Sequence, residues 1–168
     1  MDGADLLIDG FGRVSQTAHR VLTGAAPDVL TFRVDPDANT ISWLVWHLTR
    51  VQDDHLADAF DGEQLWTSRG WADRLGLPFE PSATGYGQRS DEVARVQAPA
   101  DLLQGYLDAV HAQTVSYLRS IGDPDLDRVV DERWDPPVTL GVRLVSVISD
   151  GLQHAGQAAY VRGIAERR

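Results

Sequence analysis

The sequence predicts an all-α protein, a four-helix bundle in which some helices are joined by long crossover connections. Four long stretches contain no proline and carry apolar residues at helical spacing, and the prolines cluster between these stretches. No segment shows the strict apolar–polar alternation of a half-buried strand. The chain has 168 residues, 43% of them hydrophobic, which is enough to bury a core. We therefore expect a single domain over residues 1–168.

The first two helices are predicted over about residues 3–23 and 40–60, with Asn39 or Thr40 as the cap of the second. The apolar face of the second helix consists of Ile41, Leu44, Val45, Leu48, Val51, Leu56 and Ala59. Trp43, Trp46 and Arg50 lie outside that face. So do Asp53 and Asp54, which we expect to be solvated.

Residues 61–98 form a long mixed connection, in which short helices are plausible near 63–75 and near 90–96, the latter capped by Ser90. A connection of this length in a compact domain is often functional. Its TGYGQ segment is interpreted as a turn. Its tryptophans, Trp66 and Trp71, are interpreted as packing residues, and the alternative is that they line a ligand pocket.

The third helix is predicted over about residues 99–121, and Gly122 and Pro124 end it. In the next connection, the segment VDERWD is a short extended piece that we consider too small for a sheet. The fourth helix runs from a cap at Thr139 to about residue 166. Small residues on it would let a neighbouring helix approach closely: Gly151, Ala155, Gly156, Ala158 and Ala159.

Composition removes several kinds of chemistry. The chain has no cysteine, which excludes disulfides, thiolate metal sites and a cysteine nucleophile. All 15 basic residues are arginine, so no lysine Schiff base or phosphate-loop lysine can form. The net charge of −10 argues against nucleic acid and anionic membranes as partners. No leader-like segment and no 18-residue apolar run is seen, so we expect a cytoplasmic protein.

Asp150 and His154 are four residues apart, on one face of the fourth predicted helix. His154 shares the heptad position of Leu140, Val147 and Val161, which directs it toward the core. A carboxylate on that inward face is costly unless a cation neutralises it, which favours a shared divalent metal. The alternative is that Asp150 faces solvent and His154 is a hydrogen-bonded core histidine.

A metal site that performs chemistry needs about three protein ligands. The third ligand should come from another helix, and His47 and His55 both border the apolar face of the second helix. They are eight residues apart, about 12 Å along a helix, so they cannot both bind one ion. Periodicity places His55 nearer the middle of the apolar face, but it does not decide which of the two is the third ligand. His19 and His111 have no acidic or histidine partner at chelating spacing.

Two segments, SWLVWHLTRVQDDH and SDGLQHAGQAAYVRG, resemble the DinB-like (YfiT-like) superfamily. The stretch from RWDPPV to AYVRG is more closely similar to its actinobacterial mycothiol-transferase-like branch. The resemblance covers nearly the whole chain and implies an up-down-down-up bundle that binds a divalent metal, commonly zinc or nickel. It identifies the ligands as His47, Asp150 and His154. Many members carry histidine where this chain has Asp150, whereas mycothiol-dependent maleylpyruvate isomerase has an acidic residue there.

The resemblance also implies a function. Relatives use a low-molecular-weight thiol such as mycothiol, whose pKa the metal lowers so that the thiolate attacks a small electrophile, in detoxification or stress. The absence of cysteine fits a sulfur nucleophile supplied from outside. Gln157 would orient a metal ligand, Trp43 flanks His47, and Arg50 or Arg162 would hold a carboxylate of the thiol or substrate.

Three other functions stay open at this point. The protein can be a non-catalytic bundle that dimerises and binds a metal or ligand. It can be a thiol-dependent isomerase of the maleylpyruvate type. It can also be a hydrolase that uses metal-bound water. A homodimer is expected because small bundles of this superfamily often associate.

Overall fold

The computed structural model describes residues 1–168 and is mostly helical, which confirms the predicted class. Its elements are α1 (Gly3–Leu22), α2 (Pro27–Leu30), α3 (Ile41–Ala59), α4 (Leu65–Ser68), α5 (Trp71–Leu75), α6 (Ser90–Val93), α7 (Ala100–Leu118), a 3-10 helix (Asp123–Asp127), β1 (Val129–Asp131), β2 (Val138–Thr139) and α8 (Leu140–Ala165). None of the helices has the length and apolar character needed to cross a membrane.

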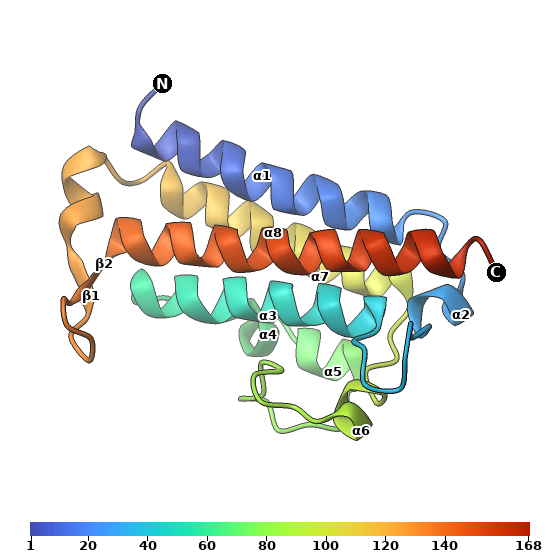
Figure 1. Ribbon diagram of the computed structural model, residues 1–168. Coiled ribbons are helices and arrows are strands. Elements are labelled where there is room, and N and C mark those ends of the chain that lie inside the picture. The colour runs from blue at the N-terminus through green and yellow to red at the C-terminus, as the bar shows by residue number, and fades with distance from the viewer.

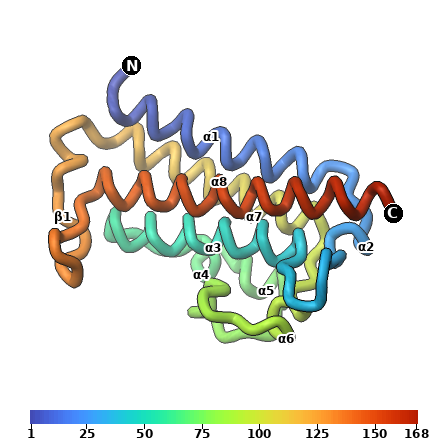
Figure 2. The backbone as a smooth tube through the Cα atoms, in the orientation of Figure 1, coloured from blue at the N-terminus to red at the C-terminus, as the bar shows by residue number.

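The four long helices lie side by side (Figure 1). Both α8 and α7 pack against α1 and against α3. Along the chain, α1 and α8 run in one direction and α3 and α7 in the other, as the colour gradient of Figure 2 shows. The antiparallel pair α3 and α8 is important for the site, because residues near the start of α3 lie opposite residues in the second half of α8.

Side chains fix the starts of the long helices. The hydroxyl of Thr40 accepts a hydrogen bond from the Trp43 N–H, which settles the choice between Asn39 and Thr40. Thr139 caps α8 as predicted, with its hydroxyl on the Val142 N–H. The predicted Ser90 cap is wrong.

At α6 the capping position belongs to Arg89, whose backbone N–H donates to the carboxylate of Glu92. The hydroxyl of Ser90 instead donates to the carbonyl of Pro36 and so ties α6 to the loop before α3.

The close contact between α1 and α8 depends on two glycines. A Cβ on Gly151 would lie 3.0 Å from a methyl of Val14, and one on Gly10 would lie 2.9 Å from Ile148. Ala155 and Ala158 are buried beside this contact, whereas Gly156 and Ala159 face solvent. Part of the predicted small-residue stripe therefore serves helix packing.

The connection from residue 61 to 98, with α4, α5 and α6, lies over a side of α3 that α8 leaves free (Figure 1). This cover buries residues that the periodicity placed outside the core, among them Trp43, Trp46 and Arg50. Asp53 is buried too, which corrects the expectation that it is solvated. Its carboxylate accepts hydrogen bonds from the N–H groups of Leu65 and Trp66 and from the hydroxyl of Tyr106.

The expectation that the VDERWD segment is too small for a sheet is wrong. Strand β1 pairs with β2 in an antiparallel two-stranded sheet beside the first turn of α8. Helix α8 begins directly after β2 and contacts both strands. The Leu140 N–H also donates to the carbonyl of Arg128.

Candidate metal centre

Helices α3 and α8 bring three of the predicted site residues together. One ligand atom from each of His47, Asp150 and His154 lies within 4.8 Å of the other two. His55 is not in this group, because its Nδ1 faces the guanidinium of Arg143 at 3.1 Å. Periodicity left open which histidine of α3 lies near Asp150 and His154, and in the structure it is His47.

His47 is buried and its ring is fixed on two sides. Its Nδ1 lies 2.6 Å from the carbonyl oxygen of Thr84, and the ring of Trp43 stacks on it with centroids 4.5 Å apart. A carbonyl only accepts, so the ring proton is on Nδ1 and the lone pair is on Nε2. Burial lowers the pKa of His47, which favours the neutral imidazole that a metal requires.

His154 is oriented in the same way. Its Nδ1 lies 3.0 Å from the side-chain oxygen of Gln157, and its Nε2 lies 3.4 Å from Oδ1 of Asp150. The hydrogen bond with Asp150 raises the pKa of His154, because the carboxylate stabilises the imidazolium. Without a cation, a proton on Nε2 thus offsets the carboxylate charge, and a metal ion would take that role.

Asp150 is the strongest indication that the site accommodates a cation. Its Oδ2 is shielded from solvent and has no hydrogen-bond partner, an arrangement that is costly for a carboxylate oxygen. Partial burial opposes its ionisation, but the hydrogen bond from His154 and the positive charge of that imidazole outweigh this and lower the pKa of Asp150. An anionic oxygen without a partner beside two imidazole nitrogens fits a divalent metal.

The loop that holds His47 depends on Gly85. This residue has a φ of +98°, and a Cβ there would lie 2.6 Å from Nδ1 of His47 and 3.1 Å from the Trp43 ring. Three residues on, the side-chain oxygen of Gln88 accepts from the indole N–H of Trp43. Sequence reasoning interpreted TGYGQ only as a turn. Its paired glycines inside a long connection are the signal of a close backbone approach.

The residues predicted to support the site divide into two groups. Gln157 and Trp43 contact the ligands directly. Arg50 does not face the centre: its fully buried guanidinium donates to the carbonyl of Ala83 and to Gln64. It therefore acts on the loop next to Thr84 and is out of reach of a substrate carboxylate, which corrects that expectation.

Arg162 is also engaged elsewhere. One of its nitrogens donates to three carbonyls at the end of α1, those of Arg20, Val21 and Thr23. It closes the C-terminus of that helix. His19 has an acidic partner after all, since its Nε2 lies 2.8 Å from a carboxylate oxygen of Asp108. The partner comes from α7 and not from nearby sequence.

Fold and site together define a helical protein with a candidate centre of two imidazoles and one carboxylate on two antiparallel helices. The family model for mycothiol-S-transferase matches residues 7–166, and the chain belongs to that family, within the DinB/YfiT-like superfamily. A conserved protein from Enterococcus faecalis has a similar crystal structure, with 30% sequence identity and a TM-score of 0.92. The match covers 100% of this chain and 99% of the other. A comparison with curated proteins finds no match.

Proposed function

We propose that the protein is a divalent-metal-dependent thiol S-transferase that uses a low-molecular-weight thiol such as mycothiol and transfers it to a small electrophile. The observation that carries the proposal is the convergence of His47, Asp150 and His154 within 4.8 Å in a member of the mycothiol-S-transferase family. The absence of cysteine agrees with a sulfur nucleophile supplied from outside. We also propose that the fold is a single-domain four-helix bundle of up-down-down-up order.

Nε2 of His47, Nε2 of His154 and the carboxylate of Asp150 would hold the metal, and three protein ligands leave room for another ligand. Imidazole nitrogen suits zinc and nickel, and zinc also accepts carboxylate oxygen as a ligand. A bound divalent cation would supply Lewis acidity that lowers the pKa of a thiol.

The chain itself supplies orientation. The Thr84 carbonyl and Gln157 hold the two imidazoles by Nδ1, which leaves both Nε2 atoms free, and that of His154 lies 3.4 Å from Oδ1 of Asp150. The rings of Trp43 and His47 are stacked, and Trp43 also meets His154 edge-on at 6.2 Å between centroids. Trp43 thus provides an apolar wall that shields the ligands from water.

The first test is the metal content of gently purified protein, measured by elemental mass spectrometry. We expect about one equivalent of zinc or nickel in the wild type, because a catalytic site with three ligands holds one ion. The variants His154→Ala and His47→Ala should lose it. His55→Ala is the matched control from the same helix and should keep it. Absence of metal from the wild type, even after incubation with zinc and nickel, would favour the non-catalytic binding module.

The second test is conjugation of mycothiol to a panel of electrophiles by the metal-loaded protein. Turnover that His154→Ala abolishes would support the transferase. No conjugation across the panel would reject it. Asp150 favours one alternative, a thiol-dependent isomerase of the maleylpyruvate type, because the resemblance places an acidic residue there in that enzyme. Incubation of maleylpyruvate with mycothiol separates the two activities.

The homodimer stays a prediction. Helix α8 carries apolar side chains that face solvent, among them Val142, Val145, Leu152 and Tyr160. Light scattering on the purified protein at several concentrations measures the oligomeric state directly.

A further inference from the structure

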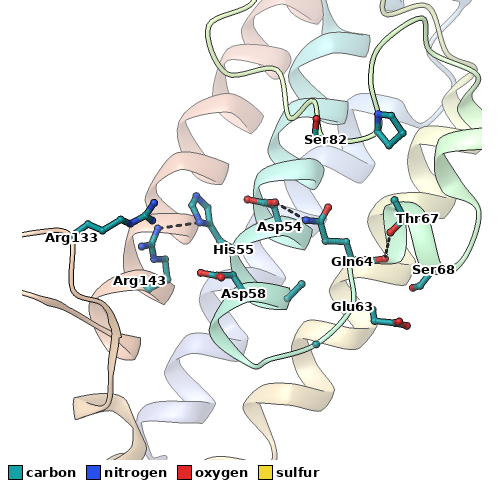
Figure 3. A pocket seen from close by; sticks show the side chains of 13 residues that line it. Asp54, His55, Asp58, Glu63, Gln64, Thr67, Ser68, Ser82, Arg133 and Arg143 are labelled. Atoms are coloured by element: carbon teal, nitrogen blue, oxygen red, sulfur yellow. Dashed lines mark hydrogen bonds between the residues drawn. The ribbon is translucent and has the colours of Figure 1, made fainter.

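A cavity of about 900 Å³ lies on the same two helices as the candidate metal centre. Figure 3 shows its lining: Asp54, His55 and Asp58 of α3 lie in the middle, with Arg133 and Arg143 on one side and Gln64 on the other. The segment at Pro81 and Ser82 borders it further along. None of these residues belongs to the metal-binding group.

The cavity and the centre share their framework. His55 follows His47 by eight residues on α3, and Arg143 precedes Asp150 by seven on α8. Both separations correspond to about 10–12 Å along a helix. Ser82 is two residues before Thr84, whose carbonyl holds His47. A ligand in the cavity could thus extend to the centre through a spacer of about that length.

Most residues that line the cavity carry hydrogen-bonding side chains. Carboxylates come from Asp54, Asp58 and Glu63, an amide from Gln64, and hydroxyls from Thr67, Ser68 and Ser82. Of the three carboxylates, Asp54 accepts a hydrogen bond from Gln64, whereas Asp58 and Glu63 make no side-chain hydrogen bond or ion pair within the protein. No aromatic side chain other than the imidazole of His55 lines the cavity. An apolar electrophile would leave these polar groups unpaired.

The charges disfavour an anion. Both arginines of the cavity are already paired with Asp131, whose Oδ2 lies 2.9 Å from a nitrogen of Arg133 and 2.9 Å from one of Arg143. The carboxylates of Asp58 and Glu63 have no such partner, so the remaining local charge is negative. A neutral ligand group that can both donate and accept hydrogen bonds best matches the lining of this cavity.

His55 adds one fixed donor. A nitrogen of Arg143 donates to Nδ1 of His55 at 3.1 Å, so the imidazole accepts there and carries its proton on Nε2. Burial, together with the charge of Arg143, lowers the pKa of His55 and keeps the ring neutral. The cavity therefore presents an N–H donor from His55 close to the carboxylates of Asp54 and Asp58, which only accept.

We propose that this cavity binds the polyhydroxylated part, a sugar or cyclitol, of the thiol cosubstrate while its sulfur reaches the metal centre. Hydroxyl groups donate to the carboxylates of Asp54 and Asp58 and accept from His55 and Gln64. The inference rests on the proposed thiol transferase function, and it names the feature by which the protein distinguishes mycothiol from a simple thiol.

The first experiment measures binding without turnover. Isothermal titration calorimetry uses the sugar–cyclitol portion of mycothiol, without its cysteine, on the metal-free protein. We expect measurable binding that weakens about tenfold in Asp58→Leu, the effect of losing one charge-assisted hydrogen bond. Asp58 is exposed and unpaired, so this variant should fold, which circular dichroism verifies. Asp37→Leu removes another exposed aspartate outside the cavity and should bind like the wild type.

The second experiment compares thiols. The wild type should have a lower KM for mycothiol than for N-acetylcysteine, which lacks the polyol, and Asp58→Leu should lose that preference through KM with little change in kcat. Equal KM values in the wild type, or absence of polyol binding, would overturn the subsite and leave the transferase intact. No turnover with either thiol, beside normal polyol binding, would reject the transferase and leave the cavity a polyol site.

Discussion

At the scale of single residues, the centre depends on which nitrogen of each histidine is free. His47 and His154 both use Nδ1 for a hydrogen bond to an oxygen, one from the backbone of Thr84 and one from the side chain of Gln157. Both Nε2 atoms are therefore left for a metal. The two hydrogen-bond acceptors differ in one respect. The backbone carbonyl of Thr84 remains when its side chain is substituted, whereas the side chain of Gln157 can be removed.

We expect Gln157→Ala to weaken metal binding about 10- to 100-fold, the usual cost of losing a hydrogen bond behind a ligating histidine. His154 would keep its position on α8 but lose the contact that orients its ring. Competition with a chromogenic chelator measures the affinity.

Gln153→Ala is the matched control, since Gln153 lies one turn earlier and bonds only to Ser149. Similar losses in both variants would show that Gln157 has no particular role in orientation.

The ligands themselves were predictable from sequence to different degrees. The spacing of Asp150 and His154 places them together on any helix. His47 and His55 could not be separated by periodicity, since both border the same apolar face. What separates them is the register of α3 against α8, which sets His47 beside His154 and His55 beside Arg143. Such a register arises from tertiary packing, and the family resemblance supplied what local pattern could not.

At the scale of elements, the loop between α5 and α6 completes the centre. It contributes the Thr84 carbonyl to His47, and its approach is possible only because Gly85 has no side chain. Arg50 of α3 binds the same loop by donating a hydrogen bond to the carbonyl of Ala83. The loop is therefore a structural part of the site.

Gly85→Ala should both destabilise the protein and lower its metal content. The positive φ alone costs a residue with a Cβ about 1–2 kcal/mol, and the new methyl would clash with Nδ1 of His47. Gly87→Ala is the control, because Gly87 also has a positive φ but no atom lies near its Cβ position. Thermal melts and elemental mass spectrometry of both variants distinguish the cost of the positive φ, which both share, from the clash with His47, which only Gly85→Ala has. Equal metal loss in the two would contradict a specific role for Gly85.

The long helices were predictable because their apolar faces and caps are local signals, such as Thr139 before α8. The arrangement of the connection over residues 61–98 was not predictable, because its contacts with α3 are set by tertiary structure. Asp53 is polar by sequence but buried in fact, since the N–H groups of Leu65 and Trp66 satisfy its carboxylate. The small sheet was missed for a related reason. Two or three residues are too few for a pattern, and α8 holds β2 in position.

At the scale of the whole molecule, one buried carboxylate links the small sheet to α8 and, through Arg143, to α3. Asp131 belongs to β1, accepts from Arg133 beyond that strand and from Arg143 of α8, and Arg143 in turn contacts His55 of α3. The side-chain and backbone hydrogen bonds from Arg133 hold the pKa of Asp131 well below its usual range, and the bond from Arg143 adds to this.

The lowered pKa predicts how the stability provided by Asp131 depends on pH. A carboxyl whose pKa is lower in the folded state stabilises the protein fully above its unfolded pKa, and this stabilisation is lost as the pH falls toward the folded value. We expect Asp131→Asn to lower the Tm by several degrees at pH 7. The difference from the wild type should persist down to about pH 4, near the ordinary pKa of aspartate, and shrink below it. Thermal melts by circular dichroism between pH 7 and 3 measure both curves.

Asp9→Asn provides the comparison that makes this test specific. Asp9 pairs with Arg13 on the exposed surface of α1, where solvent screens the charges and a pair contributes little. Its removal should change the Tm only slightly at any pH. Because Asp131 is buried and bonded to both arginines, its replacement by asparagine removes the negative charge and one of the two acceptor oxygens, which weakens the contact that positions Arg143 toward His55. A pH-independent difference for Asp131→Asn would mean that the carboxylate charge does not hold these three segments together.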